Sequence, residues 1–161
     1  MMFLILLFSK LAHAPTGDFE KIDAVCEDMS IPLEMLDVAC DIERAARDTG
    51  VKEDWFIKGL IANAYAESTL NPDAISPGKK SFGIFQLHVS GMGKGWEYEE
   101  MKDVRLSTFA IVSEAKKMGI YKKKRNSHSA TSFLCTRVLR PANSHEQVEK
   151  RIDILENLFE K

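Results

Sequence analysis

The sequence has no apolar run long enough to cross a bilayer, no strong net charge and no repeats. Its apolar stretch MFLILLF, near the N-terminus, is much shorter than the ~20 residues that a spanning helix needs. The formal net charge is −2, so no global field draws the chain to nucleic acid, and no nucleic-acid partner is expected. Neither an internal repeat nor a low-complexity linker divides its 161 residues, which is the usual size of one domain.

Cysteine and histidine are also sparse. The three cysteines (Cys26, Cys40 and Cys135) form no Cys-x-x-Cys pair, and the four histidines form no His-Glu-x-x-His motif. These patterns give no support to a zinc site, and we expect neither a metal nor a cofactor. If the chain is exported, one disulfide can form and one thiol is left over, but the spacing does not choose the pair.

Residues 1–14 differ in composition from the rest of the chain. The apolar run is followed by SKLAHA, in which Ala12 and Ala14 fit the small-x-small pattern of a signal peptidase site. We therefore expect a signal peptide with cleavage after Ala14. The alternative is an apolar N-terminal segment that packs on the domain or anchors it, because no Lys or Arg precedes the run. Residues 15–161 would form the domain itself.

The hydrophobic periodicity predicts a mainly α-helical domain. The composition is 45% hydrophobic, which is enough to bury one core. Residues 68–100 interrupt the helical pattern with Pro and Gly turn signals, and SFGIFQL within them could be a short strand or the start of a helix. Long irregular segments inside compact domains are usually functional. Helices are predicted at 18–29, 32–48, 53–67, 103–118, 129–139 and from Ser144 towards the C-terminus.

Glu67 is the carboxylate that merits interpretation. It lies in the last turn of the predicted 53–67 helix, which is rich enough in apolar residues to be central. The negative end of the helix dipole and apolar neighbours both disfavour the charged form of a carboxyl group. That environment suits a general acid. A glutamate at a helix end is, however, often only a solvated surface residue.

The residues after Glu67 change the weight of that interpretation. Glu67 and Ser68 are followed by Asn71-Pro72-x-Ala-x-Ser76 and then by Ser81-x-Gly-Ile-x-Gln86-Leu. This pattern resembles the catalytic motif of the soluble lytic transglycosylases and goose-type lysozymes, over residues 60–88 and more weakly over 103–119. The short chain and GIFQLH are most similar to the versions that bacteriophages carry.

The resemblance implies a lysozyme-like fold with a small β or loop element and a cleft for peptidoglycan glycan strands. The bond cut would join N-acetylmuramic acid to N-acetylglucosamine. Glu67 matches the general acid/base, and the nucleophile would be water in a lysozyme or the C6 hydroxyl of the sugar in a transglycosylase. The chain would be exported to the periplasm or outside the cell, or virion-associated, with virion or cell-envelope components as possible partners.

Further residues take roles from the same resemblance. Gln86 matches the glutamine of the cleft, since an amide both donates and accepts hydrogen bonds. Ser68 would support the Glu67 side chain, although a helix-end cap is an equal alternative. Ser76 and Ser81 would shape the loop, and Gly83 would let the backbone approach closely. Four other residues of the segment have simpler interpretations. We expect a solvated loop acid at Asp73, core aromatics at Phe82 and Phe85, and a surface histidine at His88.

The sequence departs from the family in two places. Lys80-Ser81 stands where the family has Gly-Ala. The family's Ala-Tyr-Asn-x-Gly motif, whose tyrosine helps to hold the glutamate, has no counterpart after residue 120. Candidates for that tyrosine are Tyr65, Tyr98 and Tyr121. A glycan-binding or structural module that kept the fold without useful turnover is therefore the alternative function.

Overall fold

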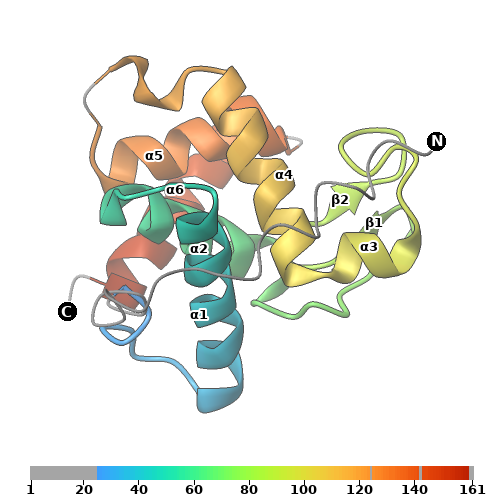
Figure 1. The fold of residues 1–161 in the computed structure, drawn as a ribbon, viewed down its shortest axis with the longest axis horizontal. Coiled ribbons are helices and arrows are strands. Elements are labelled where there is room, and N and C mark those ends of the chain that lie inside the picture. The colour runs from blue at the N-terminus through green and yellow to red at the C-terminus, as the bar shows by residue number, and fades with distance from the viewer. Residues whose placement is uncertain (1–24, 124, 142, 160–161) are drawn as a thin grey trace, which may run out of the picture.

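The computed structural model describes residues 25–159 apart from 124 and 142. It is mainly helical, as predicted (Figure 1). The segment 1–14, with its predicted signal peptide, lies outside the described residues, as does most of the predicted helix 18–29. The described end of that helix, residues 25–28, is a turn.

Four of the predicted helices are confirmed with shifts of a residue or two. They are α1 (Leu33–Asp48), α2 (Asp54–Ser68), α4 (Val104–Lys117) and α6 (Ser144–Phe159). The predicted helix 129–139 is only partly correct. Its first half belongs to α5 (Ser127–Phe133), but Leu134–Leu139 winds as a π-helix. A short 3₁₀ turn, Ile120–Lys122, precedes α5.

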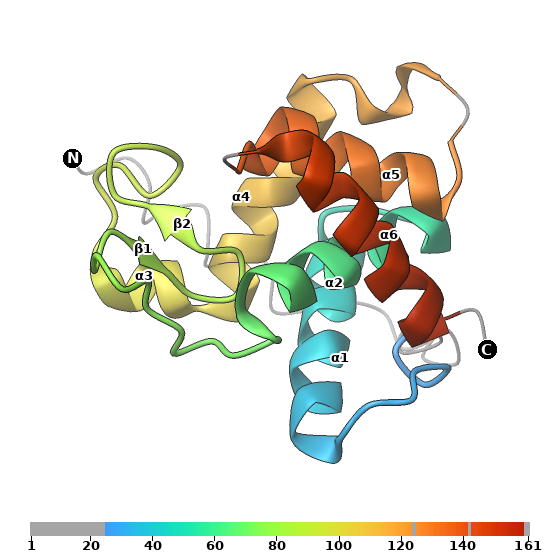
Figure 2. The same ribbon diagram turned by 180° about the vertical axis from the view of Figure 1, so that it is seen from behind.

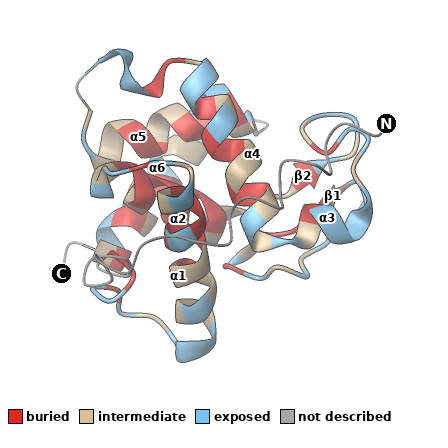
Figure 3. Cartoon of the chain, in the orientation of Figure 1, coloured by how far each residue is buried: buried red, intermediate tan, exposed pale blue. Residues whose placement is uncertain are grey.

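Helix α2 is the centre of the molecule, as its composition predicts. It packs against α5, α6 and α1, and Figure 3 shows how buried residues gather on these helices. Gly59 allows the closest approach, because a Cβ there would lie 3.1 Å from both the Cβ of Ala130 and the backbone nitrogen of Thr131. The crossing of α2 and α5 therefore depends on a residue without a side chain.

The irregular segment forms a small lobe beside the helices (Figure 1). Strands β1 (Ser81–Phe82) and β2 (Leu87–His88) pair antiparallel, with Phe82 opposite Leu87. Helix α3 (Tyr98–Lys102) covers β1, and α4 then returns to the helical part and packs on α1. Both Phe82 and Phe85 are buried, which confirms that they belong to the core.

Gly83 fixes the contact between the hairpin and α3. Its φ is +77°, and a Cβ at this position would collide with the carbonyl of Met101. The predicted close backbone approach at Gly83 is therefore confirmed.

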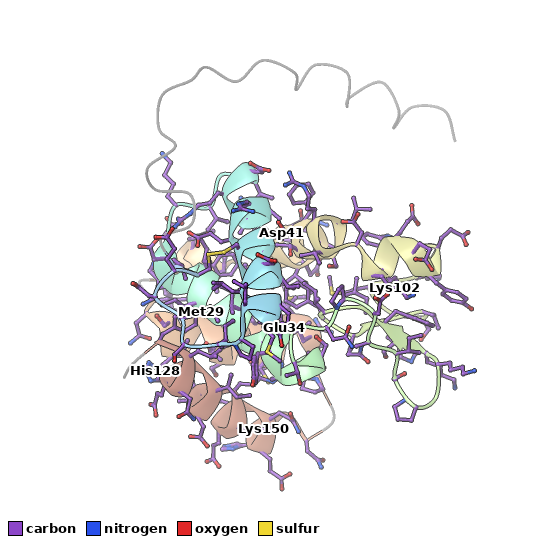
Figure 4. All side chains as sticks on the ribbon, turned by 90° about the horizontal axis from the view of Figure 1, so that it is seen from below. Met29, Glu34, Asp41, Lys102, His128 and Lys150 are labelled. Atoms are coloured by element: carbon purple, nitrogen blue, oxygen red, sulfur yellow. A yellow bond between two sulfur atoms is a disulfide. The ribbon has the colours of Figure 1, made fainter. Side chains whose placement is uncertain are left out.

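A disulfide and a buried glutamate join the N-terminal turn to α1. Cys26 is bonded to Cys40, with their Cα atoms 5.4 Å apart (Figure 4). Glu43 accepts hydrogen bonds of 3.0 Å from the backbone N–H groups of Val25 and Cys26. The turn at 25–28 is therefore held by both a covalent and a polar link. Within the described residues, the helices are too short or too polar for any of them to traverse a bilayer.

Candidate functional site

The carboxylate of Glu67 is held by an arginine from the C-terminal helix. Nη2 of Arg151 donates a 2.7 Å hydrogen bond to Oε1 of Glu67. The Arg151 side chain is 2% exposed, whereas that of Glu67 is 18% exposed. Figure 2 shows α6 crossing α2, which is the arrangement that makes this contact possible. The apolar neighbours expected around Glu67 are therefore only part of its surroundings, since a buried guanidinium is its hydrogen-bond partner.

Only one oxygen of the Glu67 carboxylate is occupied. In the described part of the chain, Oε2 accepts no hydrogen bond, while Oε1 is bound to Arg151. A carboxyl group can keep one oxygen as an acceptor and carry a proton on the other. The arrangement thus fixes the orientation of Glu67 and leaves Oε2 available for a proton transfer.

Arg151 is itself anchored by a buried amide. Its Nη1 donates to Oδ1 of Asn63 at 2.8 Å. The amide nitrogen of Asn63 donates in turn to the carbonyls of Gly59 and Thr131, at 2.8 and 3.2 Å. Three helices, α2, α5 and α6, therefore contribute to one polar network behind Glu67. Both terminal nitrogens of Arg151 are bonded in this network, whereas its buried Nε has no hydrogen-bond partner among the described residues.

Arg151 was missed by the sequence reasoning, although a signal for it exists. The predicted apolar stripe of the last helix contains Val148, Ile152 and Leu155. Arg151 lies three residues after Val148 and four before Leu155, so it belongs to the same face of the helix. A charged residue inside an apolar stripe indicates a buried partner, and here that partner is Glu67.

The charges of Glu67 and Arg151 both affect the pKa of the Cys135 thiol. It is buried within the π-helix. Burial raises the pKa of the Cys135 thiol, the positive charge of Arg151 lowers it and the negative charge of Glu67 raises it again. The π-helix therefore carries a buried thiol whose pKa depends on the Glu67–Arg151 pair. Segments of π-helix are often found at functional sites.

Ser68 connects the end of α2 to the hairpin turn. Its hydroxyl donates to the carbonyl of Ile84 at 3.0 Å and to that of Ala64 at 3.1 Å. The expected direct support of the Glu67 side chain by Ser68 is therefore not what the structure shows. Ser68 instead fixes the distance between Glu67 and the turn that carries Gln86.

Gln86 is constrained in both its backbone and its side chain. Its φ is +48°, a left-handed conformation that is uncommon outside glycine and recurs at functional sites. Its amide nitrogen donates to the carbonyls of Gly83 and Ala74, at 2.9 and 3.1 Å. The side chain therefore braces the loop with its nitrogen, which leaves Oε1 as the atom for a ligand.

Ser76 shapes the loop as predicted. Its hydroxyl oxygen accepts hydrogen bonds from the backbone nitrogens of Ser81 and Lys80, at 3.0 and 3.2 Å. Ser81 contributes through its backbone, because it pairs with His88 in the two-stranded sheet. Both serines thus shape the loop.

A cavity of about 310 Å³ lies beside this turn. Residues 85–88 of the hairpin line one side, Glu114 of α4 and Met118 just after that helix line another, and residues 138–140 close it. Glu67 is not among the lining residues. Ser68, the residue after Glu67, donates to the carbonyl of Ile84 just before the lining turn, and the π-helix Leu134–Leu139 ends at the cavity.

The remaining candidates lie elsewhere. Asp73 has a side chain that is 80% exposed and pairs with Lys102 at 3.4 Å, so it is the solvated loop acid that the sequence favoured. Tyr98 stacks on Phe82, and Tyr121 packs against Trp55. Across the described residues no tyrosine hydroxyl bonds to Glu67; Arg151 occupies that role.

The chain was compared with known proteins, and no relative was found. No protein-family model, no curated protein and no solved structure matches the chain.

Proposed function

We propose that the protein cleaves the glycan strands of peptidoglycan, with a lysozyme-like fold and Glu67 as the general acid/base. The bond cut joins N-acetylmuramic acid to N-acetylglucosamine. One observation carries the proposal. At the end of a buried helix, the buried Arg151 orients the carboxyl group of Glu67 by one oxygen and leaves the other unbound. The Glu-Ser and Gly-Ile-x-Gln motifs add the resemblance to lytic transglycosylases and goose-type lysozymes.

The proposed reaction uses this geometry for two proton transfers. A proton on Oε2 of Glu67 passes to the glycosidic oxygen as the bond to C1 breaks. The resulting carboxylate takes a proton from the nucleophile as the nucleophile bonds to C1. Water as the nucleophile gives a reducing end, and the C6 hydroxyl gives a 1,6-anhydro end. Arg151 stays bound to Oε1 throughout and stabilises the carboxylate formed between the two steps.

The reaction would run with one carboxyl group. Most glycosidases place two carboxyl groups across the bond. Asp73, the nearest acid of the loop in sequence, is already paired with Lys102 at the surface. The proposal therefore assigns both proton transfers to Glu67.

Export or inclusion in a virion fits the Cys26–Cys40 disulfide. Disulfides persist in oxidising compartments such as the periplasm and the extracellular space, and the two sulfurs are bonded here. Peptidoglycan is reached from the same compartments. This supports a protein that works outside the cytoplasm.

A glycan-binding module without turnover is the second candidate. The lack of an Ala-Tyr-Asn-x-Gly motif after residue 120 favours it, because the tyrosine of that motif helps to hold the glutamate in the family that the sequence resembles. This function would need the cavity and the loop but no proton on Glu67.

Purified peptidoglycan separates the two candidates. The enzyme releases soluble sugars, and mass spectrometry identifies the end formed, because an anhydro end is lighter than a reducing end by one water. The binding module co-sediments with the wall and releases nothing. If the protein releases no sugars and does not co-sediment with the wall, both functions are contradicted.

A further inference from the structure

The cavity beside Gln86 combines an apolar wall with one cationic group at its edge. Met92 and Met118 are among its apolar lining, and Arg140 stands at the end of the π-helix that forms the third side. Its volume of about 310 Å³ is at the lower end of the range for small-ligand sites. The cavity therefore suits a single sugar residue with its substituents better than a long chain.

Arg140 is held in place by its own helix. Its backbone N–H donates to the carbonyl of Cys135 at 2.8 Å, and its Nε donates to the carbonyl of Arg137 at 2.8 Å. The residue has a φ of +50°, so the chain leaves the π-helix in a left-handed conformation at this point. The guanidinium is thus anchored through Nε, and its two terminal nitrogens make no hydrogen bond within the described residues.

No carboxylate of the described residues lies within 4 Å of Arg140. The other charged group of the cavity, Glu114, is paired with Lys117 at 3.7 Å. Nδ1 of His88 accepts from the backbone nitrogen of Ser90, so a neutral His88 carries its proton on Nε2 and can only donate there. The cavity therefore offers an unneutralised guanidinium, whose fork matches a carboxylate.

We propose that this cavity binds the muramic acid residue of the glycan and that Arg140 recognises a carboxylate attached to it. The inference rests on the proposed function, since it assigns a part of the same substrate to a place. The apolar wall contacts the N-acetyl group and the face of the ring, and Arg140 distinguishes the acidic sugar from neutral N-acetylglucosamine. The carboxylate belongs either to the lactyl ether or to the peptide attached to it.

Binding to the Glu67→Gln variant tests this without cleavage. The probes are a neutral N-acetylglucosamine oligomer, a glycan fragment with free lactyl carboxylates and the same fragment with its peptides. Methyl resonances of Met92 and Met118 report occupancy of the cavity, and Met29, which belongs to the hydrophobic core and does not line the cavity (Figure 4), is the internal control. Arg140→Gln is compared with Arg137→Gln, which alters an exposed arginine of the same π-helix.

The expected result is that both acidic probes shift the two methyl resonances and that Arg140→Gln weakens their binding about tenfold. Binding of the neutral oligomer stays unchanged, and so does every affinity in Arg137→Gln. A loss confined to one acidic probe supports the inference and identifies the source of the carboxylate.

Equal loss for the neutral oligomer, or no shift at Met92 and Met118, would overturn the inference. The wild-type protein would still release sugars from peptidoglycan in that case, so the proposed function would stand. If the wild type neither binds nor releases glycan, both fail together.

Discussion

Two glutamate–arginine pairs in different regions of the molecule are built in opposite ways. In α1 the Glu43 side chain is fully buried and Arg47 is 19% exposed. Where α6 crosses α2, Arg151 is 2% exposed and Glu67 is 18% exposed. In the first pair the arginine faces solvent, and in the second the carboxyl group does.

The partners of each carboxylate explain the difference. The two carboxylate oxygens of Glu43 accept hydrogen bonds from Arg47 and from two backbone N–H groups of the N-terminal turn. All of these hydrogen bonds stabilise the fold. Glu67 has one oxygen bound and the other available. In the Glu67–Arg151 pair, a buried cation holds a partly exposed acid, which is the arrangement expected of a functional site. In the Glu43–Arg47 pair, a buried acid joins two segments of the chain, which is the arrangement expected of a structural contact.

The largest effect on stability is expected from Glu43→Ala. The substitution leaves two buried N–H groups and Arg47 without their acceptor, which should lower the free energy of unfolding by about 3–5 kcal/mol. Urea denaturation measures this. Glu34→Ala, on the exposed first turn of α1 (Figure 4), should cost less than about 1 kcal/mol. A similar fall in the free energy of unfolding for the two variants would contradict the structural role of Glu43.

Arg151→Met should instead act mainly on turnover. Without its donor, Glu67 is no longer held in one orientation, and small misplacements of a catalytic group can cost about 10²-fold in rate. The fall should be in kcat rather than in KM, with a changed pH profile, measured below the unfolding temperature of the variant. Lys150→Met, which changes the exposed neighbour on α6 (Figure 4), should leave the kcat and the pH profile unchanged. A variant that loses stability but keeps its kcat and pH profile would show that Arg151 serves the fold alone.

Gln86→Ala tests the smaller polar contribution of the hairpin. It removes two hydrogen bonds to loop carbonyls and should lower the free energy of unfolding by about 1 kcal/mol. Gln86→Gly removes the same bonds but accepts the left-handed φ without strain. Gly should therefore be less destabilising than Ala here. The reverse order in urea denaturation would mean that backbone strain at residue 86 is not significant.

The smallest effect is a dependence of stability on pH. Burial raises the pKa of Glu43 above 4.5, so the folded state holds this proton more tightly than the unfolded state does. Its contribution to stability is present below pH 4.5 and is lost as the pH rises through the folded pKa. The stability difference between wild type and Glu43→Gln, which does not titrate, should fall over that interval. A difference that rises with pH would mean that the hydrogen bonds from Cys26, Arg47 and Val25, which lower the pKa of Glu43, outweigh the effect of burial.

The sequence predicted the parts of the fold that depend on local pattern. The boundaries of α1, α2, α4 and α6 follow from apolar periodicity and turn residues, and Gly83 and Ser76 were assigned their roles correctly. The π-helix at 134–139 was not predicted, because its periodicity over six residues is too close to that of an α-helix. The turn at 25–28 depends on Glu43 and the disulfide, which are contacts distant in sequence.

The candidate site was predicted only in part for the same reason. Glu67, Ser68 and Gln86 lie within twenty residues of one another, so their spacing carried a motif. Arg151 is 84 residues from Glu67, and only the fold brings the two together. The sequence therefore indicated the acid but not the group that holds it.

The comparison of Glu67 with Glu43 gives the most direct test of the proposed role. The rate at which purified peptidoglycan is cleared should be measured for wild type, Glu67→Gln and Glu43→Gln, with equal concentrations of folded protein. We predict that Glu67→Gln lowers the rate by at least about 10²-fold, whereas Glu43→Gln clears the wall as wild type does. Clearing by Glu67→Gln at the wild-type rate would contradict the assignment of Glu67 as the proton donor.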